Sequence, residues 1–262
     1  MSTLSLSSPK MMSERSGGIP FSRLFLVELR KQIDTRAGRW LLIVIALVNT
    51  ALIVLTLTTA EAKYLTWSEL TMAASIGQLL LLPLIGVLAA TSEWSQRTAL
   101  TTFALEPRRT RVNLAKLASA AALGLIVMAL TLVAGAVANV AGMLWRGGDG
   151  SWAMDWSMLF GAALALLLLV AQGIAFGLAL LSTPMAIVAY LLLPTLWTVL
   201  TAFIDALAAP ARWLDMNVTL LPLMAGGDLR PTGWSQLTTS VVVWVGLPLA
   251  IGLWRTIRRN VA

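Results

Sequence analysis

The chain has 262 residues, 58% of them hydrophobic and only 12% charged, and this composition excludes an ordinary soluble globular domain. It has no Cys and no His, which excludes a disulfide framework, thiolate chemistry and the commonest metal ligand and general base. The net charge of +7 fits a membrane protein with basic cytoplasmic loops, and we prefer this interpretation to nucleic-acid binding.

The first 20 residues are rich in Ser and end in Gly-Gly-Ile-Pro. We expect residues 1–20 to form a disordered cytoplasmic tail. No short apolar core precedes a small-residue cleavage site here, so the sequence predicts no secretory signal peptide. We expect residues 21–262 to form a single transmembrane domain.

Residues 21–36 have the pattern of an amphipathic helix. Apolar residues recur every four positions, and basic residues fall on the opposite side. A helix of this kind is suited to the headgroup plane of a bilayer, and packing on another subunit is the alternative. The apolar residues are Phe21, Phe25, Leu26, Leu29 and Ile33, and the polar ones are Arg23, Arg30, Lys31 and Asp34.

Six later segments are apolar enough to cross about 30 Å of hydrocarbon as helix, which takes roughly 20 residues. A break at 182–184 separates the fourth from the fifth, because Pro184 interrupts a helix. One uninterrupted helix there would have about 47 residues and would exceed the membrane about twofold. The predicted spans are 40–60, 69–92, 117–145, 157–181, 185–204 and 237–254.

The distribution of Lys and Arg predicts the orientation. Of 19 such residues, 15 fall before the first span, between the second and third, or after the sixth. Basic residues concentrate on the cytoplasmic side of membrane proteins, so both termini are expected to be cytoplasmic. The sequence therefore predicts an all-α, polytopic protein of the cell membrane with six spans.

Few residues of the chain could act in catalysis or bind a cofactor. The glycines at 147, 148 and 150 lack the Lys of a phosphate-binding loop, so the chain is not expected to bind ATP itself. We find no ionisable residue in the interior of the predicted spans, which disfavours an ion-coupled carrier and an embedded enzyme. No catalytic residue, cofactor site or metal site is predicted.

Neutral amides are the polar side chains that we expect at membrane depth. Each must find a partner in hydrocarbon, either as an interhelical hydrogen bond or in the lining of a polar transport path. Both interpretations remain open from the sequence. The four amides are Asn49, Gln78, Asn139 and Gln172.

Two further patterns bear on helix packing. Gly173 and Gly177 form a GxxxG motif that lets two helices approach closely. Pro83, Pro194 and Pro248 lie within predicted spans, where each can kink its helix.

The most informative segment is the loop between the second and third spans, residues 93–116. Residues 98–105 can form a short amphipathic helix, which Pro107 ends. Leu100, Phe103 and Leu105 are apolar in a loop that should be hydrated, so we expect them to dock on a surface outside the loop.

At this point the sequence resembles a type-2 ABC transporter permease, the membrane subunit of an ATP-driven exporter. The resemblance rests on this loop, on the helix before the first span, which matches the family's elbow helix, and on the ending at 244–259, typical of short actinobacterial permeases. Arg97 stands where the family usually has Gly. The loop positions that match the family's pattern are Glu93, Thr98, Leu105, Pro107 and Lys116.

The resemblance implies that this chain forms the membrane path and that a separate subunit hydrolyses ATP. Two copies of a separate cytoplasmic ATPase would bind ATP and Mg²⁺, and a second permease, expected to be identical, would complete a homodimer. The helix at 98–105 would be the coupling helix, with Arg108, Arg109 and Arg111 adding polar and ionic contacts to the ATPase. Residues 206–236 would form an external element that re-enters the outer leaflet. The cargo moved outward would be amphipathic or hydrophobic: a drug, an antibiotic, a peptide or a lipid.

Two other classes of function remain. One is an ATP-independent secondary transporter or channel, which transport by this chain alone would favour. The other is a membrane scaffold or embedded sensor, which a neighbouring gene for an ATPase would count against.

Overall fold

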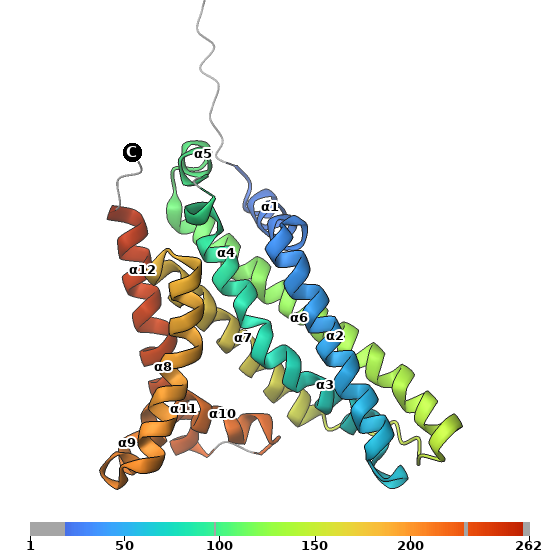
Figure 1. Ribbon diagram of the computed structural model, residues 1–262. Helices are drawn as coiled ribbons and strands as arrows, with labels where there is room; N and C mark the ends of the chain where they lie inside the picture. Colours follow the sequence, from blue (N-terminus) through green and yellow to red (C-terminus); the bar gives the residue numbers. More distant parts are fainter. Residues whose placement is uncertain (1–18, 97, 228–229, 259–262) are drawn as a thin grey trace, which may run out of the picture.

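The computed structural model describes residues 19–96, 98–227 and 230–258, and throughout these ranges the regular structure is helical (Figure 1). The expected tail at 1–20 lies almost wholly outside the described residues. The α-helices are α1 Phe21–Asp34, α2 Arg36–Thr59, α3 Trp67–Leu81, α4 Pro83–Ser95, α5 Ala99–Leu105, α6 Arg109–Arg146, α7 Trp156–Leu180, α8 Thr183–Phe203, α9 Ala208–Leu214, α10 Met216–Met224, α11 Pro231–Val241 and α12 Leu247–Arg258. Short 3-10 turns lie at Ala62–Tyr64 and Asp205–Leu207, and a π-helical turn at Val242–Gly246 joins α11 to α12.

Six helical segments in the described part of the chain are long and apolar enough to cross a membrane. The predictions of an all-α chain with six such segments are confirmed, and they identify a multi-pass membrane protein. The segments are Arg36–Thr59, Trp67–Ser95, Arg109–Arg146, Trp156–Leu180, Thr183–Phe203 and Pro231–Arg258.

The α7 helix lies at the centre of the bundle, with α4 and α12 packed along it. Glycine permits the contact with α4. A Cβ atom added to Gly173 would lie 2.2 Å from the carbonyl oxygen of Pro83, and one added to Gly177 would lie 2.6 Å from Cβ of Ala90. The close approach predicted from GxxxG is therefore confirmed, and it occurs between two helices of the same chain.

A sharp turn separates α7 from α8, as the position of Pro184 predicts. Leu181 ends α7 in the left-handed conformation, with φ of 54°, and its N–H bonds the carbonyl of Gly177. The α8 helix then begins at Thr183 with Pro184 in its first turn, where a missing N–H does no harm. The fourth and fifth spans are thus two helices side by side.

Prolines shape two of the other spans. Pro83 divides the second span into α3 and α4, because a proline inside a helix removes one backbone hydrogen bond. Pro248 follows the π-helical turn in the sixth span, where the chain passes from α11 to α12. Pro194 lies within the continuous helix α8.

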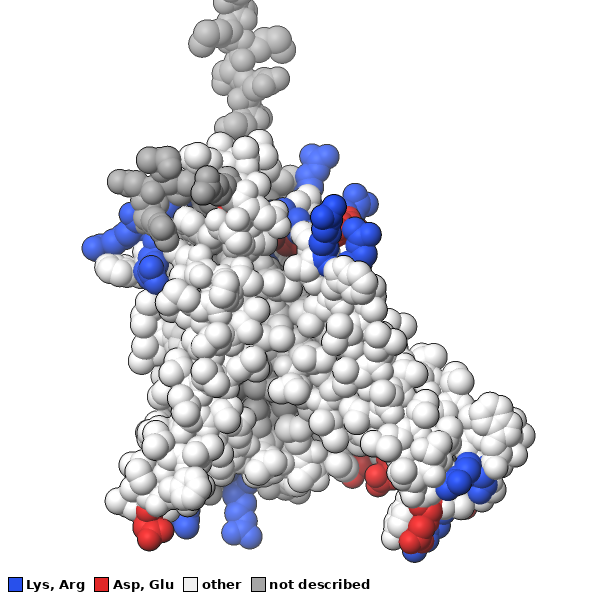
Figure 2. All heavy atoms as spheres, in the orientation of Figure 1, with Lys and Arg blue, Asp and Glu red and all other residues white. Residues whose placement is uncertain are grey.

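The described ends of the chain lie at one end of the bundle, together with α5 (Figure 1). Lys and Arg side chains gather at this end, which we call the basic end, and fewer lie at the opposite end (Figure 2). The opposite end carries α9 and α10, the helices that form within the predicted external element. The α10 helix packs on the first turns of α7, where a Cβ on Gly161 would lie 1.8 Å from the carbonyl oxygen of Leu223.

Candidate functional site

The α5 helix stands at the basic end, between α4 and α6, and it presents apolar side chains outward. Leu100 is 52% exposed and Leu105 is 74% exposed. Thr98 and Pro107, on either side of the helix, are also exposed. Arg97 and the side chain of Phe103 lie outside what the structure describes. The predicted short helix therefore forms, and two of its three predicted docking residues are accessible.

Hydrogen bonds hold both ends of the loop in place. The N–H of Thr98 donates to the carbonyl of Glu93 (2.9 Å). At the other end Glu106 is buried and accepts from the guanidinium of Arg111 at 2.9 Å and from the N–H of Arg108 at 3.3 Å. The geometry of the loop is thus set by its own backbone and by a buried carboxylate.

The predicted basic cluster after Pro107 is divided between surface and interior contacts. Arg108 is exposed, whereas Arg109 donates to the carbonyl of Thr256 on α12. Arg111 also donates to the carbonyl of Ile19 at 2.8 Å, so it ties the start of α6 to the residues before α1. Of the three arginines, Arg108 has the side chain most open to a partner.

Glu93 and Lys116 differ most from the sequence prediction. They were expected in a hydrated loop, but α4 continues to Ser95 and α6 begins at Arg109, so both residues lie within helices. Their side chains are 3% and 1% exposed, and Nζ of Lys116 lies 3.1 Å from Oε1 of Glu93. This pair is therefore an internal ion pair, and its side chains are not accessible at the surface of the chain. Both residues lie outside the predicted spans 69–92 and 117–145, near the ends of α4 and α6 that face the basic end.

Two residues of α1 complete a four-membered charge network. Lys116 Nζ lies 2.7 Å from Oε2 of Glu28, and Lys31 Nζ lies 2.6 Å from the other oxygen of Glu28 and 3.1 Å from Glu93. The network joins α1, α4 and α6 with two positive and two negative charges. Because Glu28 and Lys116 are almost fully buried, each needs the other to offset its desolvation.

The α1 helix buries its polar face and exposes its apolar face, which is the opposite of an amphipathic helix on a soluble protein. Its buried residues are the polar Glu28 and Gln32, and Nε2 of Gln32 donates to Ser119 on α6 at 2.7 Å. Apolar residues, among them Leu26 and Val27, are exposed instead. Burial lowers the pKa of Lys31, but attraction to Glu28 and Glu93 outweighs this effect, and the pKa lies above its ordinary value.

Two of the predicted membrane-depth amides come together. Oγ1 of Thr131 on α6 lies 3.2 Å from the side-chain amide of Asn49 on α2 and 3.1 Å from Oε1 of Gln78 on α3. With its amide turned over, Asn49 also reaches the carbonyl of Ala74 at 3.0 Å. These contacts make Asn49 and Gln78 an interhelical hydrogen-bonding cluster, and Gln78 is only 1% exposed.

The other two amides lie apart from this cluster. Asn139 donates to the carbonyls of Gly150 and Ser151, so it fastens the loop between α6 and α7. Gln172 is 2% exposed, and its Nε2 has no hydrogen-bond partner among the described residues. The structure therefore does not gather the four predicted amides into one path.

Sequence reasoning missed Glu28, Gln32, Ser119 and Thr131. A signal was present for the first two: Glu28 and Gln32 are four residues apart and so share one helix face, opposite the exposed apolar side. No comparable signal marks Ser119 or Thr131, since a hydroxyl in a membrane helix commonly bonds its own backbone.

No group of three or more His, Cys, Asp or Glu that could hold a metal occurs in the part of the chain that the structure describes. Comparisons with protein-family models, curated proteins and solved structures found no match to this chain.

Proposed function

We propose that this chain is the membrane subunit of an ATP-driven exporter, a permease of the type-2 ABC kind moved by a separate cytoplasmic ATPase. The observation that carries the proposal is α5, a short helix between the second and third spans whose Leu100 and Leu105 point away from the protein. Exposed leucines beyond the ends of membrane helices are suited to a protein partner. ATP and Mg²⁺ would be bound by that partner.

The proposed orientation places the basic end in the cytoplasm. Lys and Arg concentrate there (Figure 2), as the positive-inside rule requires, and both described chain ends lie there too. In this orientation α1 lies at the cytoplasmic surface with Leu26 and Val27 toward the lipid, as an interfacial helix would. The α9 and α10 helices then face outside and form the proposed re-entrant element.

The proposed movement begins when the ATPase closes on ATP and displaces α5. The loop is bonded at both ends, to α4 through Thr98 and to α6 through Glu106 and Arg111, so displacement of α5 moves these helices. The charge network ties α1 to the same two helices. Close packing of α4 on α7 then carries the motion into the centre of the bundle. A second copy of the chain would provide the facing wall.

The cargo that fits this chain is amphipathic or hydrophobic. The outer helices α2 and α8 expose broad apolar faces, including Leu47 and Leu193. The buried amides Asn49 and Gln78 are engaged with Thr131, so the described spans offer few free polar groups to a hydrophilic solute. Drugs, antibiotics, peptides and lipids are the classes that we propose.

Co-purification from the native membrane tests the proposal. The tagged chain is expected to bring with it a chain that has a phosphate-binding loop and hydrolyses ATP. The double variant Leu100→Asp, Leu105→Asp should weaken this association at least about a hundredfold, because it removes two apolar contacts. The variant Leu100→Met, Leu105→Met keeps the apolar area and should retain the ATPase. Absence of an ATPase from the wild-type sample, or equal retention by the Asp variant, would contradict the proposal.

A further inference from the structure

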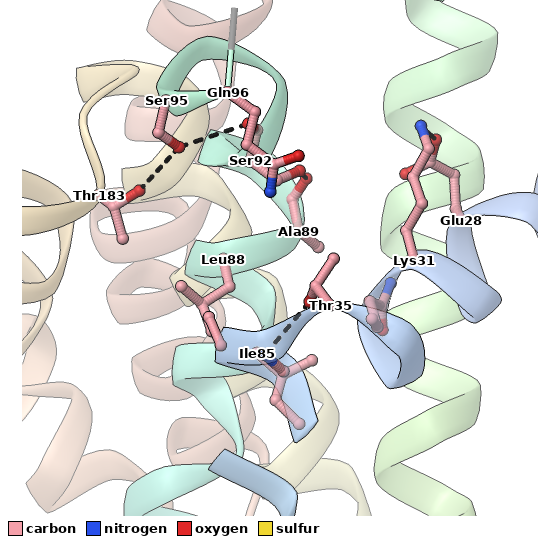
Figure 3. Close-up of a pocket in the computed structure, with 13 residues that line it drawn as sticks. Glu28, Lys31, Thr35, Ile85, Leu88, Ala89, Ser92, Ser95, Gln96 and Thr183 are labelled. Carbon is pink, nitrogen blue, oxygen red and sulfur yellow. Dashed lines mark hydrogen bonds and ion pairs between the residues drawn. The ribbon is translucent and has the colours of Figure 1, made fainter. Parts of the chain in front are cut away.

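A cavity of about 150 Å³ opens beside the charge network at the basic end (Figure 3). Its walls come from α1, α2, α4 and the first residue of α8. A cavity of this volume accommodates a molecule the size of benzene, so it can take a group of about six heavy atoms. It therefore suits the end of a head group rather than a whole lipid or drug.

The lining divides into polar walls and an apolar floor. Figure 3 shows the side chains of Ser95 and Thr183 on one side and those of Glu28 and Lys31 on the other. Ile85, Leu88 and Ala89 of α4 provide the apolar surface between them. A ligand with a short polar end and an apolar body matches this division.

The hydroxyls on the first side present acceptors to the cavity. The hydroxyl of Ser95 donates to the carbonyl of Thr91 at 2.8 Å. Thr91 gives its own hydroxyl hydrogen to Val87, so the 2.8 Å contact between Thr91 and Thr183 takes its hydrogen from Thr183. The two hydroxyl oxygens also lie 3.3 Å apart. The hydrogens of Ser95 and Thr183 are therefore engaged within this cluster, and the oxygens retain lone pairs.

Gln32 also lines the cavity, but its polar atoms are turned away from the open space. Its Nε2 is bonded to Ser119, but its Oε1 is buried and has no hydrogen-bond partner among the described residues. A buried acceptor without a donor costs free energy.

The opposite wall carries a cation. Lys31 is 35% exposed, whereas its partners Glu28 and Glu93 are nearly buried, so its ammonium is the charge of the network that a ligand meets. With two carboxylates and two ammonium groups, the network has no net charge and does not repel a second ammonium as an isolated lysine would. Lys31 suits an anionic group at the cavity mouth.

We propose that this cavity binds the zwitterionic head of an aminophospholipid, with its primary ammonium at Ser95 and Thr183 and its phosphate at Lys31. The lipid tails would extend over the exposed apolar faces of α2 and α8, which begin at Arg36 and Thr183 beside the cavity. The site lies at the level where these spans begin, which is where lipid head groups lie. This inference goes beyond the proposed transport function and does not depend on an ATPase.

The test compares two lipids that differ only in N–H groups. The purified chain is placed in an equimolar mixture of phosphatidylethanolamine and phosphatidylcholine with the same acyl chains, and retained lipids are counted by native mass spectrometry. Phosphatidylethanolamine should be retained about tenfold over phosphatidylcholine, because only its ammonium can donate hydrogen bonds. Equal retention of the two lipids would overturn the proposal.

Two variants locate the binding. Ala89→Leu fills the cavity without removing a polar group, and it should abolish the preference, whereas Ala51→Leu on the exposed side of α2 should leave it unchanged. The double variant Ser95→Ala, Thr183→Val removes the acceptors at nearly constant volume and should also abolish the preference. It provides the test if Ala89→Leu does not fold. Its control is Thr195→Val, an exposed threonine of α8.

Persistence of the tenfold preference in the double variant would overturn the proposal. A parallel binding experiment with soluble phosphoethanolamine distinguishes a lipid from a free metabolite. Binding of phosphoethanolamine without any enrichment of phosphatidylethanolamine would contradict the lipid assignment. Neither an ATPase nor a nucleotide is present in this experiment. A negative result for lipid binding therefore does not contradict the proposed transport function, and absence of an ATPase partner does not contradict the lipid site.

Discussion

At the scale of single residues, the most constrained group is the buried ammonium of Lys116. It lies 2.7 Å from Glu28 and 3.1 Å from Glu93, and its side chain is 1% exposed. A charge in that position is tolerated only because two carboxylates face it, and those carboxylates depend equally on the lysine. Removal of Lys116 leaves one cation, Lys31, for two nearly buried carboxylates.

We therefore expect Lys116→Met to lower the free energy of unfolding by about 3–5 kcal/mol. Denaturant unfolding in detergent, followed by tryptophan fluorescence, measures the change. The matched control is Lys63→Met, which removes a pair with Glu61 whose side chains are 62% and 72% exposed. That loss should be less than about 1 kcal/mol. Equal effects of the two variants would show that the network is not buried as described.

The dependence of unfolding stability on pH in the alkaline range tests the raised pKa of Lys31. Its folded pKa lies above the ordinary 10.5, so its contribution is fully present below that value and is lost as the pH rises through the folded pKa. The unfolding midpoint should therefore show no loss from Lys31 between about pH 7 and 9. Comparison of wild type with Lys31→Met should give a constant difference over this range. A difference that shrinks well below pH 10.5 would contradict the pKa direction.

At the scale of elements, the contact between α4 and α7 depends on the absence of side chains. A Cβ on Gly173 would lie 2.2 Å from the backbone oxygen of Pro83, and a backbone oxygen cannot rotate away as a side chain can. The helices would have to separate, with loss of packing along both.

Gly173→Ala should therefore destabilise the protein by about 1–3 kcal/mol, although alanine is the better helix former. Gly246→Ala is the control, since the nearest atom to its added Cβ is 3.9 Å away. Thermal unfolding in detergent distinguishes the two. If Gly173→Ala were neutral, α4 and α7 would not be in the close contact that the structure shows.

The elements were largely predictable from the sequence, and their pairings were not. Lipid imposes long apolar helices, so the six spans are visible in composition, and Pro184 marks the break before α8. The helices α4 and α6 extend beyond the predicted spans because Glu93 and Lys116 look like loop residues until their partners are known. Glu28, which neutralises Lys116, comes from a helix distant in sequence. Nothing local in the sequence encodes that pairing.

The candidate site was predictable in part for the same reason. Leu100 and Leu105 lie on a short helix ended near Pro107, and local pattern alone indicated this helix and its exposure. Asn49 and Gln78 were placed at membrane depth, but the choice between a transport path and a structural hydrogen bond depended on Thr131. A threonine in an apolar helix gives no sign that two amides converge on it.

At the scale of the whole molecule, the proposal requires that α5 and both chain ends face the cytoplasm. An even number of spans places both ends on one side, and the distribution of Lys and Arg selects which side (Figure 2). If the basic end faced outside, α5 could not meet an ATP-consuming partner.

Thiol labelling in intact cells measures this orientation directly, and the chain suits it because it has no native Cys. Single cysteines are introduced by Leu105→Cys on α5 and by Ala153→Cys in the exposed loop between α6 and α7. We predict that a membrane-impermeant maleimide labels the second variant in intact cells and the first only after permeabilisation. Labelling of the Leu105→Cys variant in intact cells would contradict the account.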